Sequence, residues 1–331
     1  MIITKTPFRI SFFGGGTDYP EWFLTNAGAV LSTTIDKYCY ITCRRLPPFF
    51  SHRHRVVYSA VETVASAEEI KHPAVRAALL WKKIEDGLEI HHDGDLPARS
   101  GLGSSSSFTV GLLNALYALE GKAVSKRQLA EDSIYLEQSV IGEAVGSQDQ
   151  VAASFGGLNL IEFQRDTAFV VNPVIIDAEK REALSEHVML FFTGISRIAA
   201  TVAEKKIRSI KSRTVELQRM YEMVWEAQAL LQGPDESLGK FGALLNESWK
   251  LKRSLSDGVS SEFIDSAVEV ALGAGALGVK ILGAGGGGFL MVFADPSRHA
   301  AIKSALGRLV FVPINLDNEG TRVVLYEPSG L

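Results

Sequence analysis

Residues 96–107 read Leu96-Pro97-Ala98-Arg99-Ser100-Gly101-Leu102-Gly103-Ser104-Ser105-Ser106-Ser107, and an apolar segment with helical spacing follows them as far as Leu119. Backbone N–H groups at a helix N-terminus bind anions such as nucleotide phosphates, and the helix dipole favours the same charge. Glycine lets the backbone approach such a ligand closely, and serine hydroxyls can bond phosphate oxygens or Mg²⁺. The pattern therefore predicts a phosphate-binding loop, with a flexible glycine-serine turn as the alternative.

This loop differs from two widespread nucleotide-binding patterns. It lacks the Gly-Lys-Ser/Thr of a Walker sequence, and it does not have the form of a Rossmann fingerprint. The loop alone therefore predicts a phosphate ligand without identifying the fold.

The composition indicates an ordinary globular protein. The 331 residues suffice for two domains or one large domain, and 46% hydrophobic with 22% charged residues argues against disorder. The net charge of -4, without a large basic block, disfavours nucleic acid or an anionic membrane as a partner.

Several features favour a cytoplasmic location. The two cysteines, Cys39 and Cys43, alternate along a predicted strand, so they should lie on one face about 13 Å apart, too far for a disulfide. We expect two buried free thiols, which suit a reducing compartment. The N-terminus has no apolar core of signal-peptide length, and no window approaches the roughly 18 apolar residues of a membrane span.

The first half of the chain has strand and helix patterns in turn. Alternation of apolar and polar residues predicts strands, and three- or four-residue spacing predicts helices. The predicted strands are 9–13, 29–45 (as two strands), 55–58, 89–95 and 158–163. The predicted helices are 73–86, 105–119 (with Gly121 as its C-cap) and 125–141.

The second half is richer in long helices. We expect a domain boundary near 165–185. The predicted strands are 188–192, 279–282, 289–293, 309–314 and 321–326. The predicted helices are 197–231, 236–255, 261–276 and 297–307.

Three segments together resemble the GHMP kinases, a family that includes galactokinase, homoserine kinase, mevalonate kinase and phosphomevalonate kinase. The first motif is Thr6-Pro7-Phe8-Arg9-Ile10-Ser11-Phe12-Phe13-Gly14-Gly15-Gly16-Thr17-Asp18-Tyr19. The second is the loop at 96–107. The third is Lys280-Ile281-Leu282-Gly283-Ala284-Gly285-Gly286-Gly287-Gly288-Phe289. They occur in family order, so the resemblance spans nearly the whole chain.

The resemblance implies an α+β protein with the GHMP kinase fold. Residues 1–175 would form an N-terminal, ribosomal-S5-like α/β domain with a left-handed crossover. Residues 176–331 would form a C-terminal, ferredoxin-like α+β domain. ATP and substrate would meet in the cleft between the two.

The form of the first motif narrows the resemblance to a subgroup. Phe-Phe-Gly-Gly-Gly-Thr-Asp-Tyr-Pro-Glu-Trp looks like the D-glycero-D-manno-heptose 7-phosphate kinases, whereas galactokinases have Glu-His in place of Gly15-Gly16. Those enzymes phosphorylate the anomeric hydroxyl to give the 1,7-bisphosphate, on the way to GDP-heptose for surface polysaccharides. The implied ligands are ATP, Mg²⁺ and a small sugar phosphate.

The resemblance also implies residue roles at the centre of phosphoryl transfer. Asp149, in Gly146-Ser147-Gln148-Asp149-Gln150, matches the family's catalytic aspartate and would take the sugar hydroxyl proton. Arg9 would stabilise charge on the transferring phosphate. A capping Asp and a surface strand Arg are the alternatives from the residues alone.

Ligands for ATP and Mg²⁺ follow from the same comparison. Ser105 and Glu137 match the family's two protein ligands of Mg²⁺, and Glu131 and Glu143 are competitors for the carboxylate. The predicted contacts to ATP phosphate are Pro97, Ser100, Gly101, Leu102, Gly103, Ser104, Ser105, Ser106 and Ser107.

The acceptor sugar would lie against the first motif. Asp18 should accept hydroxyl hydrogen bonds, and the glycines there would let the sugar approach the backbone, or else form only a tight turn. The full set of predicted neighbours is Gly14, Gly15, Gly16, Thr17, Asp18 and, from the third motif, Gly286.

A second phosphate on the acceptor would need a cation. We select Arg53 and Arg197, although for any single arginine a solvated surface role is the better interpretation. The wider set of candidates is Arg44, Arg45, Arg53, Arg55, Arg76 and Arg197.

Other functions stay open at this point. One is the 1-phosphorylation of an unphosphorylated sugar such as fucose or arabinose, and another is a non-catalytic sugar sensor on the same fold. The presence of Arg9, Ser105, Glu137 and Asp149 disfavours the sensor, and Thr17-Asp18-Tyr19 disfavours a diphosphomevalonate decarboxylase. We expect a monomer or homodimer.

Overall fold

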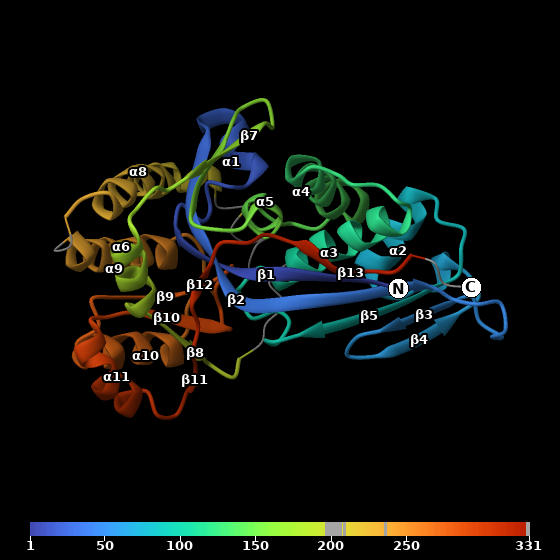
Figure 1. Ribbon diagram of the computed structural model, residues 1–331. Coiled ribbons are helices and arrows are strands. Elements are labelled where there is room, and N and C mark those ends of the chain that lie inside the picture. Colours follow the sequence, from blue (N-terminus) through green and yellow to red (C-terminus); the bar gives the residue numbers. More distant parts are fainter. Residues whose placement is uncertain (196–206, 208–209, 235–236, 329–331) are drawn as a thin grey trace.

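The computed structural model describes residues 1–195, 207, 210–234 and 237–328. They form two sheets with helices packed on both (Figure 1). In the described residues the larger sheet has nine strands: β1 (Ile2–Phe13), β2 (Gly28–Arg45), β3 (His54–Val57), β4 (Val61–Val64), β5 (Leu88–Gly94), β6 (Asn159–Phe163), β7 (Phe169–Pro173), β12 (Leu316–Asp317) and β13 (Arg322–Tyr326).

The smaller sheet is antiparallel, with strand order β11-β8-β10-β9. This is the ferredoxin-like order that the resemblance implies, so the expected α+β class and C-terminal fold are confirmed. Its strands are β8 (Val188–Phe192), β9 (Gly278–Ile281), β10 (Phe289–Phe293) and β11 (Val310–Val312).

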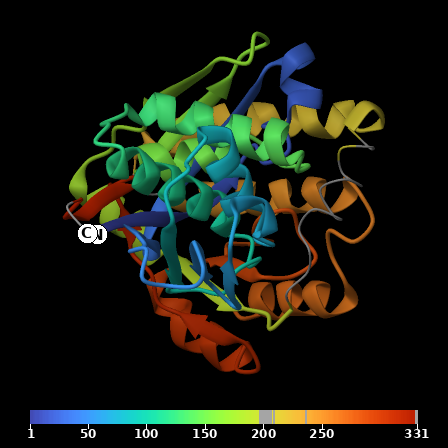
Figure 2. The same ribbon diagram turned by 90° about the vertical axis from the view of Figure 1, so that its right-hand side faces the viewer.

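The helices cover the sheets and connect them, and Figure 2 shows α2 to α5 stacked over the larger sheet. They are α1 (Pro20–Asn26), α2 (Pro73–Lys82), α3 (Ser104–Leu119), α4 (Lys126–Tyr135), α5 (Gln148–Phe155), α6 (Ala178–Glu186), α8 (Thr214–Leu231), α9 (Ser237–Ser254), α10 (Glu262–Gly273) and α11 (His299–Ala305). Short turns of 3₁₀ helix are η1 (Ala67–Glu69), η3 (Ile210–Ser212) and η4 (Pro296–Arg298), and η2 (Leu136–Ile141) is a π-helical turn.

Helix α3 is the centre of the larger domain. It packs on β1 and β2 and is buried along most of its length. Gly111 permits the close approach, because a Cβ there would lie 2.7 Å from the Thr6 hydroxyl. The helix ends before Gly121, which has a φ of 71° and fits the predicted C-cap.

Four element predictions are wrong in detail. Residues 29–45 form the single strand β2 rather than two strands, since it pairs with β1 over most of its length and with β5 or β6 at its ends. The predicted helix 125–141 is α4 continued by η2. Helix 73–86 ends at Lys82, where Lys83 takes a left-handed conformation. The predicted helix 197–231 is also not continuous, since α8 begins only at Thr214, after the 3₁₀ turn η3; part of the predicted range lies outside the described residues.

The last strands return to the first sheet. β13 pairs with β1, with Ile2 opposite Tyr326, and β12 pairs with β2. The division into 1–175 and 176–331 therefore stays a prediction for the main bodies of the two domains, with residues 316–326 contributing to the larger sheet.

Two further features concern the thiols and membranes. Cys39 and Cys43 are buried and free, as predicted, and burial raises the pKa of the Cys43 thiol to about 12. In the part of the chain that the structure describes, no helix is both long enough and apolar enough to cross a bilayer.

Candidate active site

The phosphate loop precedes α3 as predicted, and the helix begins at Ser104, one residue earlier than expected. Gly101 and Gly103 have φ values of 85° and 75°, a conformation that glycine adopts without strain. A Cβ on Gly101 would also lie 2.7 Å from the carbonyl oxygen of Leu282. The two glycines thus give the loop its shape and let it lie against the third motif.

The third motif packs against the backbone of this loop at Ser100. The Phe289 N–H donates to the Ser100 carbonyl over 3.0 Å, and a Cβ on Gly288 would lie 2.2 Å from the same oxygen. Gly286 faces another way, since its N–H donates to the Val259 carbonyl and it does not line the cleft. The third motif therefore positions the loop chiefly through backbone contacts.

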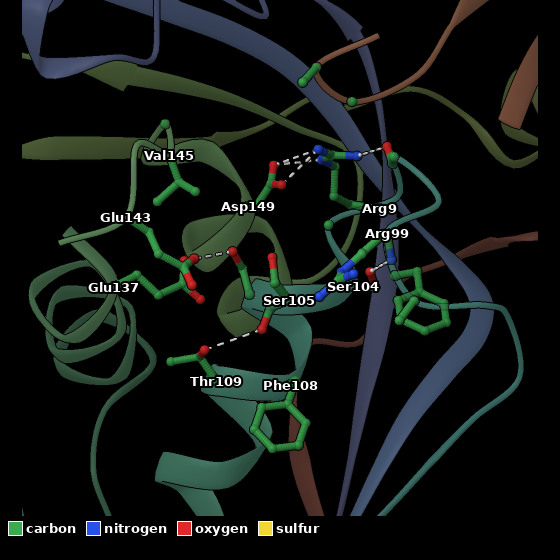
Figure 3. Close-up of a pocket in the computed structure, with 18 of the residues that line it drawn as sticks. Arg9, Arg99, Ser104, Ser105, Phe108, Thr109, Glu137, Glu143, Val145 and Asp149 are labelled. Atoms are coloured by element: carbon green, nitrogen blue, oxygen red, sulfur yellow. Dashed lines mark hydrogen bonds and ion pairs between the residues drawn. The ribbon is translucent and has the colours of Figure 1, made fainter. Parts of the chain in front are cut away.

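Arg9 and Asp149 form a bidentate ion pair beside the loop (Figure 3). Arg9 Nε and Nη2 lie 2.7 and 2.8 Å from the two carboxylate oxygens, and Arg9 Nη1 donates to the Gly101 carbonyl over 2.8 Å. The arginine side chain is 4% exposed and that of Asp149 is 22% exposed. Three nitrogens of the guanidinium are thus hydrogen-bonded, which fixes its orientation. The Asp149 side chain, in the first turn of α5, still lines the cleft.

Asp18 is buried at the border of the same cleft. Its carboxylate accepts the Gly16 N–H over 2.8 Å and the Gln148 side-chain amide over 2.9 Å. A Cβ on Gly146 would lie 2.0 Å from Asp18 Oδ2, so only glycine fits there. Gln148 and Asp149 are consecutive, so the start of α5 carries the predicted base and also contacts the predicted sugar-binding carboxylate, Asp18.

Three residues of the first motif, Gly14, Gly16 and Thr17, belong to the turn between β1 and α1. Thr17 donates its hydroxyl to the carbonyls of Gly14 and Ala29. Gly14 has a φ of 81°, and a Cβ on it would lie 1.9 Å from the Ala29 carbonyl. Of the predicted substrate neighbours, Gly15 and Asp18 line the cleft, whereas Gly14, Gly16 and Thr17 do not.

Glu137 is a buried carboxylate on η2 that faces the start of α3. Its Oε2 accepts hydrogen bonds from the Ser106 hydroxyl over 2.9 Å and from the Gln150 amide. Its Oε1 is buried and has no hydrogen-bond partner among the described residues. Burial raises the pKa of this carboxyl to about 7, and the hydrogen bonds that Oε2 accepts from Gln150 and Ser106 oppose the rise.

These features fit a Mg²⁺ ligand. Mg²⁺ prefers one or two carboxylates together with waters and substrate phosphates, so a single buried carboxylate oxygen without a partner is a suitable donor. Ser105 is exposed and lines the same cleft. Glu143 also lines the cleft, whereas Glu131 is exposed and pairs with Arg127. Among the described residues, no group of three or more His, Cys, Asp or Glu could hold a metal by itself.

The four consecutive serines, Ser104 to Ser107, differ in their contacts. Ser104 accepts the Arg99 N–H, Ser106 donates to Glu137 and Ser107 donates to the Pro7 carbonyl. Only the first three, Ser104 to Ser106, line the cleft. Gly101 and Gly103 also line the cleft, whereas four other predicted phosphate contacts do not: Pro97, Ser100, Leu102 and Ser107.

The cleft, of about 820 Å³, extends from Asp18 past the loop to an aromatic end. There His72 stacks on Phe108 with ring centroids 4.6 Å apart, and Tyr58 meets the edge of the same imidazole. Burial and the neighbouring His92 lower the pKa of His72 to about 4, so the ring is neutral at pH 7. No role was predicted for these three side chains, which come from different segments: Tyr58 follows β3, His72 precedes α2 and Phe108 lies on α3.

The candidate arginines for a second phosphate lie elsewhere. Arg53 donates to the Glu85 carbonyl and does not line the cleft, and Arg197 is outside the described residues. The other four candidate arginines do not line the cleft either. Arg44 and Arg55 pair with Glu89, Arg45 pairs with Asp86, and Arg76 donates to the Ile70 carbonyl. The cations that line the cleft, within the described ranges, are Arg9, Lys71, Arg99, Lys252 and Lys280.

Comparison with known proteins supports the resemblance. The profile of the GHMP kinases N terminal domain matches residues 61–157, and that of the GHMP kinases C terminal domain matches 226–311. Together they cover more than half of the chain.

Individual relatives extend over nearly the full length. The D-glycero-alpha-D-manno-heptose 7-phosphate kinase of Campylobacter jejuni is 28% identical over 92% of this chain and 93% of its own. The L-fucokinase/L-fucose-1-P guanylyltransferase of Bacteroides fragilis is 25% identical over 96% of this chain, which spans only 38% of that protein. The crystal structure of a D-glycero-D-manno-heptose 1-phosphate kinase from Bacteroides thetaiotaomicron superposes with a TM-score of 0.80, at 22% identity, covering 98% of both chains.

Proposed function

The chain belongs to the GHMP kinase family, and we propose that it transfers the γ-phosphoryl group of ATP to the anomeric hydroxyl of D-glycero-D-manno-heptose 7-phosphate. The observation that carries the proposal is the Arg9–Asp149 pair in a cleft that also holds Asp18 and the N-terminus of α3. The choice of acceptor rests on the similarity to the heptose 7-phosphate kinase of Campylobacter jejuni.

ATP would lie along the cleft with its phosphates at the loop. The N-terminus of α3 directs N–H groups and the positive end of its dipole at this place. The aromatic end, formed by Tyr58, His72 and Phe108, suits the planar base. Neutral His72 can stack there without a charge to be desolvated.

Transfer would proceed in line. The acceptor hydroxyl oxygen attacks the γ-phosphorus while the bond from that phosphorus to the β-γ bridging oxygen breaks, and ADP leaves with the electron pair. The Asp149 carboxylate takes the hydroxyl proton as the new bond forms. Arg9, held by Gly101, keeps that carboxylate in one orientation and places a cation beside the transferring group.

Ser105 and Glu137 would hold Mg²⁺, with Glu143 as a neighbouring carboxylate. When bound, the ion neutralises charge on the phosphates. Ser106 and Gln150 orient Glu137 through its other oxygen, leaving Oε1 directed to the ion.

A second candidate is the 1-phosphorylation of an unphosphorylated sugar. It is favoured by the position of the candidate arginines, five of which bond to groups outside the cleft. The similarity to the fucokinase of Bacteroides fragilis points the same way. A non-catalytic sensor is disfavoured, because Arg9, Ser105, Glu137 and Asp149 all border one cleft.

A coupled ADP-release assay over a panel of sugars and sugar phosphates tests the proposal. We expect turnover with D-glycero-D-manno-heptose 7-phosphate and little with fucose, arabinose or galactose. Turnover with a neutral sugar and none with the heptose phosphate would support the second candidate. Absence of sugar-dependent ADP release throughout the panel would contradict both.

A further inference from the structure

Two buried polar atoms near Gly15 have no hydrogen-bond partner among the described residues. They are the hydroxyl oxygen of Ser11 and the side-chain Oε1 of Gln148. Ser11 is 6% exposed and Gln148 is 8% exposed, and both line the cleft. A buried polar atom without a partner is unfavourable, so two of them lining one cleft suggest a ligand that satisfies them.

The orientation of the Gln148 amide follows from its partner. An ionised carboxylate only accepts hydrogen bonds, so the Nε2 group of Gln148 must face Asp18, from which it lies 2.9 Å away. The Oε1 atom therefore points away from Asp18 and stays an acceptor. Ser11 contributes a hydroxyl that can donate or accept.

Gly15 keeps the space between these two side chains open. A Cβ built on Gly15 would lie 3.6 Å from Gln148 Nε2 and 3.6 Å from the Ser11 hydroxyl oxygen. Both distances are ordinary van der Waals contacts, so a methyl group would fit there without displacing the protein. A side chain at position 15 would, however, occupy the space between the amide and the hydroxyl.

We propose that Ser11 and Gln148 form a subsite for one hydroxyl group of the acceptor, distinct from the hydroxyl that is phosphorylated. That hydroxyl donates to Gln148 Oε1 and accepts from the Ser11 hydroxyl, while Gln148 Nε2 keeps Asp18 in place. The acceptor is therefore a polyol, and Ser11 and Gln148 select among its isomers. This inference rests on the proposed function, because that function places the acceptor beside Asp18.

The first test uses Gly15→Ala, which fills the space without strain. We expect the acceptor KM to rise at least tenfold, with the ATP KM changed less than twofold and the melting temperature retained. Gly239→Ala is the matched control, since a Cβ there meets nothing within 4 Å. An unchanged acceptor KM in an active, folded Gly15→Ala protein would overturn the inference.

The second test pairs Ser11→Ala with monodeoxy analogues of the accepted sugar. One neutral hydrogen bond corresponds to about a three- to tenfold change in kcat/KM. With the wild-type protein, we expect kcat/KM for one analogue to be lower by that factor than for the parent sugar. For that analogue, Ser11→Ala should cause no further loss of kcat/KM. An equal effect of Ser11→Ala on every analogue would indicate a purely structural role and would contradict the subsite.

Calorimetric binding of the sugar without ATP separates this inference from the proposed function. One outcome is that the wild type binds the sugar, Gly15→Ala weakens this binding, and neither protein shows turnover. That outcome supports the subsite and contradicts the kinase proposal. Wild-type turnover with equal sugar affinity in both proteins overturns the subsite alone. Absence of both binding and turnover in the wild type overturns both.

Discussion

At the scale of single residues, the contact between Arg9 and Asp149 determines how the carboxylate can act. Both oxygens already accept a nitrogen donor, yet the side chain is 22% exposed and faces the cleft. A carboxylate has about four lone-pair sites, and Arg9 uses two of them. The geometry is thus compatible with a fixed, accessible base.

Replacing that base should stop turnover while ATP still binds. For Asp149→Ala we expect kcat to fall about 10²- to 10⁴-fold, the range attributed to general base catalysis. Nucleotide affinity measured by calorimetry should stay within a few-fold, because the loop and α3 are unchanged. Full activity in this variant would remove Asp149 from the mechanism.

Glu137 is the residue whose substitution should affect Mg²⁺ most. Glu137→Gln keeps the size of the side chain but removes the negative charge from the buried oxygen without a partner. We expect the Mg²⁺ concentration for half-maximal rate to rise about tenfold or more. Glu131→Gln, at an exposed carboxylate on α4, is the control, and an equal effect of both substitutions would contradict the assignment.

The roles of individual side chains were only partly predictable from the sequence. The motifs led to Arg9, Asp149 and Glu137, because each lies within a recognisable segment. They did not distinguish Ser106, which orients Glu137, from exposed Ser105, because adjacent helical residues face different sides. Nor did they reveal that Gln148 holds Asp18, a contact between residues 130 positions apart.

At the scale of elements, the phosphate loop depends on the third motif behind it. Gly101→Ala would place a methyl group 2.7 Å from the Leu282 carbonyl and force a left-handed conformation on alanine. We expect a lower melting temperature and an ATP KM raised about tenfold or more, because a shift of about 1 Å at the loop can cost 10²-fold in rate.

Gly121→Ala is the matched control for that loop variant. Gly121 has a similar φ of 71°, but a Cβ there meets nothing within 4 Å. It should therefore show the conformational cost alone, about 1–2 kcal/mol, with an unchanged ATP KM. Equal ATP KM values in the two variants would show that the contact with Leu282 is unimportant.

His72 is the N-cap of α2. This residue should make the free energy of unfolding depend on pH. Its pKa is about 4 in the folded protein and near 6.5 when unfolded, so the unfolded state binds more protons between these values. The free energy of unfolding should fall by about 2 kcal/mol as pH drops from 6.5 to 4, less than the full shift implies because the ring is partly exposed.

His72→Asn should flatten this pH dependence. Asparagine is a good N-cap, so the acceptor for the Val75 N–H is kept while the titrating group is removed. Denaturant unfolding at several pH values measures the slope, with His52→Asn as the control. An unchanged slope in His72→Asn would show that another group, such as His92, is responsible.

The sequence predicted the type of most elements and few of their partners. Apolar periodicity located α3, β8 and β10 within a residue or two, since these elements are buried and strongly patterned. It did not reveal the π-helical turn that presents Glu137, because local spacing differs little from that of an α-helix. It also divided β2, whose continuity depends on its pairing with β1.

At the scale of the whole molecule, the cleft is built from segments far apart in the chain. Lys280, on β9 of the smaller sheet, donates to the carbonyls of Ser11 and Phe12 at the end of β1. Lys252, on α9, donates to the carbonyls of Ile281 and Gly283. The Lys280 contacts join the third motif to the first, and the Lys252 contacts join it to α9, which sequence order alone could not reveal.

The last two strands, β12 and β13, also join distant parts of the chain, because they belong to the sheet that β1 and β2 begin. β13 pairs with β1 and β12 pairs with β2, so the end of the chain stabilises the strand that carries Arg9. Figure 1 shows β13 alongside β1. The active-site cleft therefore depends on both ends of the chain.

The central claim is that this protein phosphorylates the anomeric hydroxyl of a sugar at the expense of ATP. Phosphorus NMR of a reaction with D-glycero-D-manno-heptose 7-phosphate, ATP and Mg²⁺ tests it most directly. We predict a new resonance coupled to the anomeric proton, equal in amount to the ADP formed and absent with Asp149→Ala. ADP without any sugar-bound phosphate, or phosphate on a different carbon, would contradict the account.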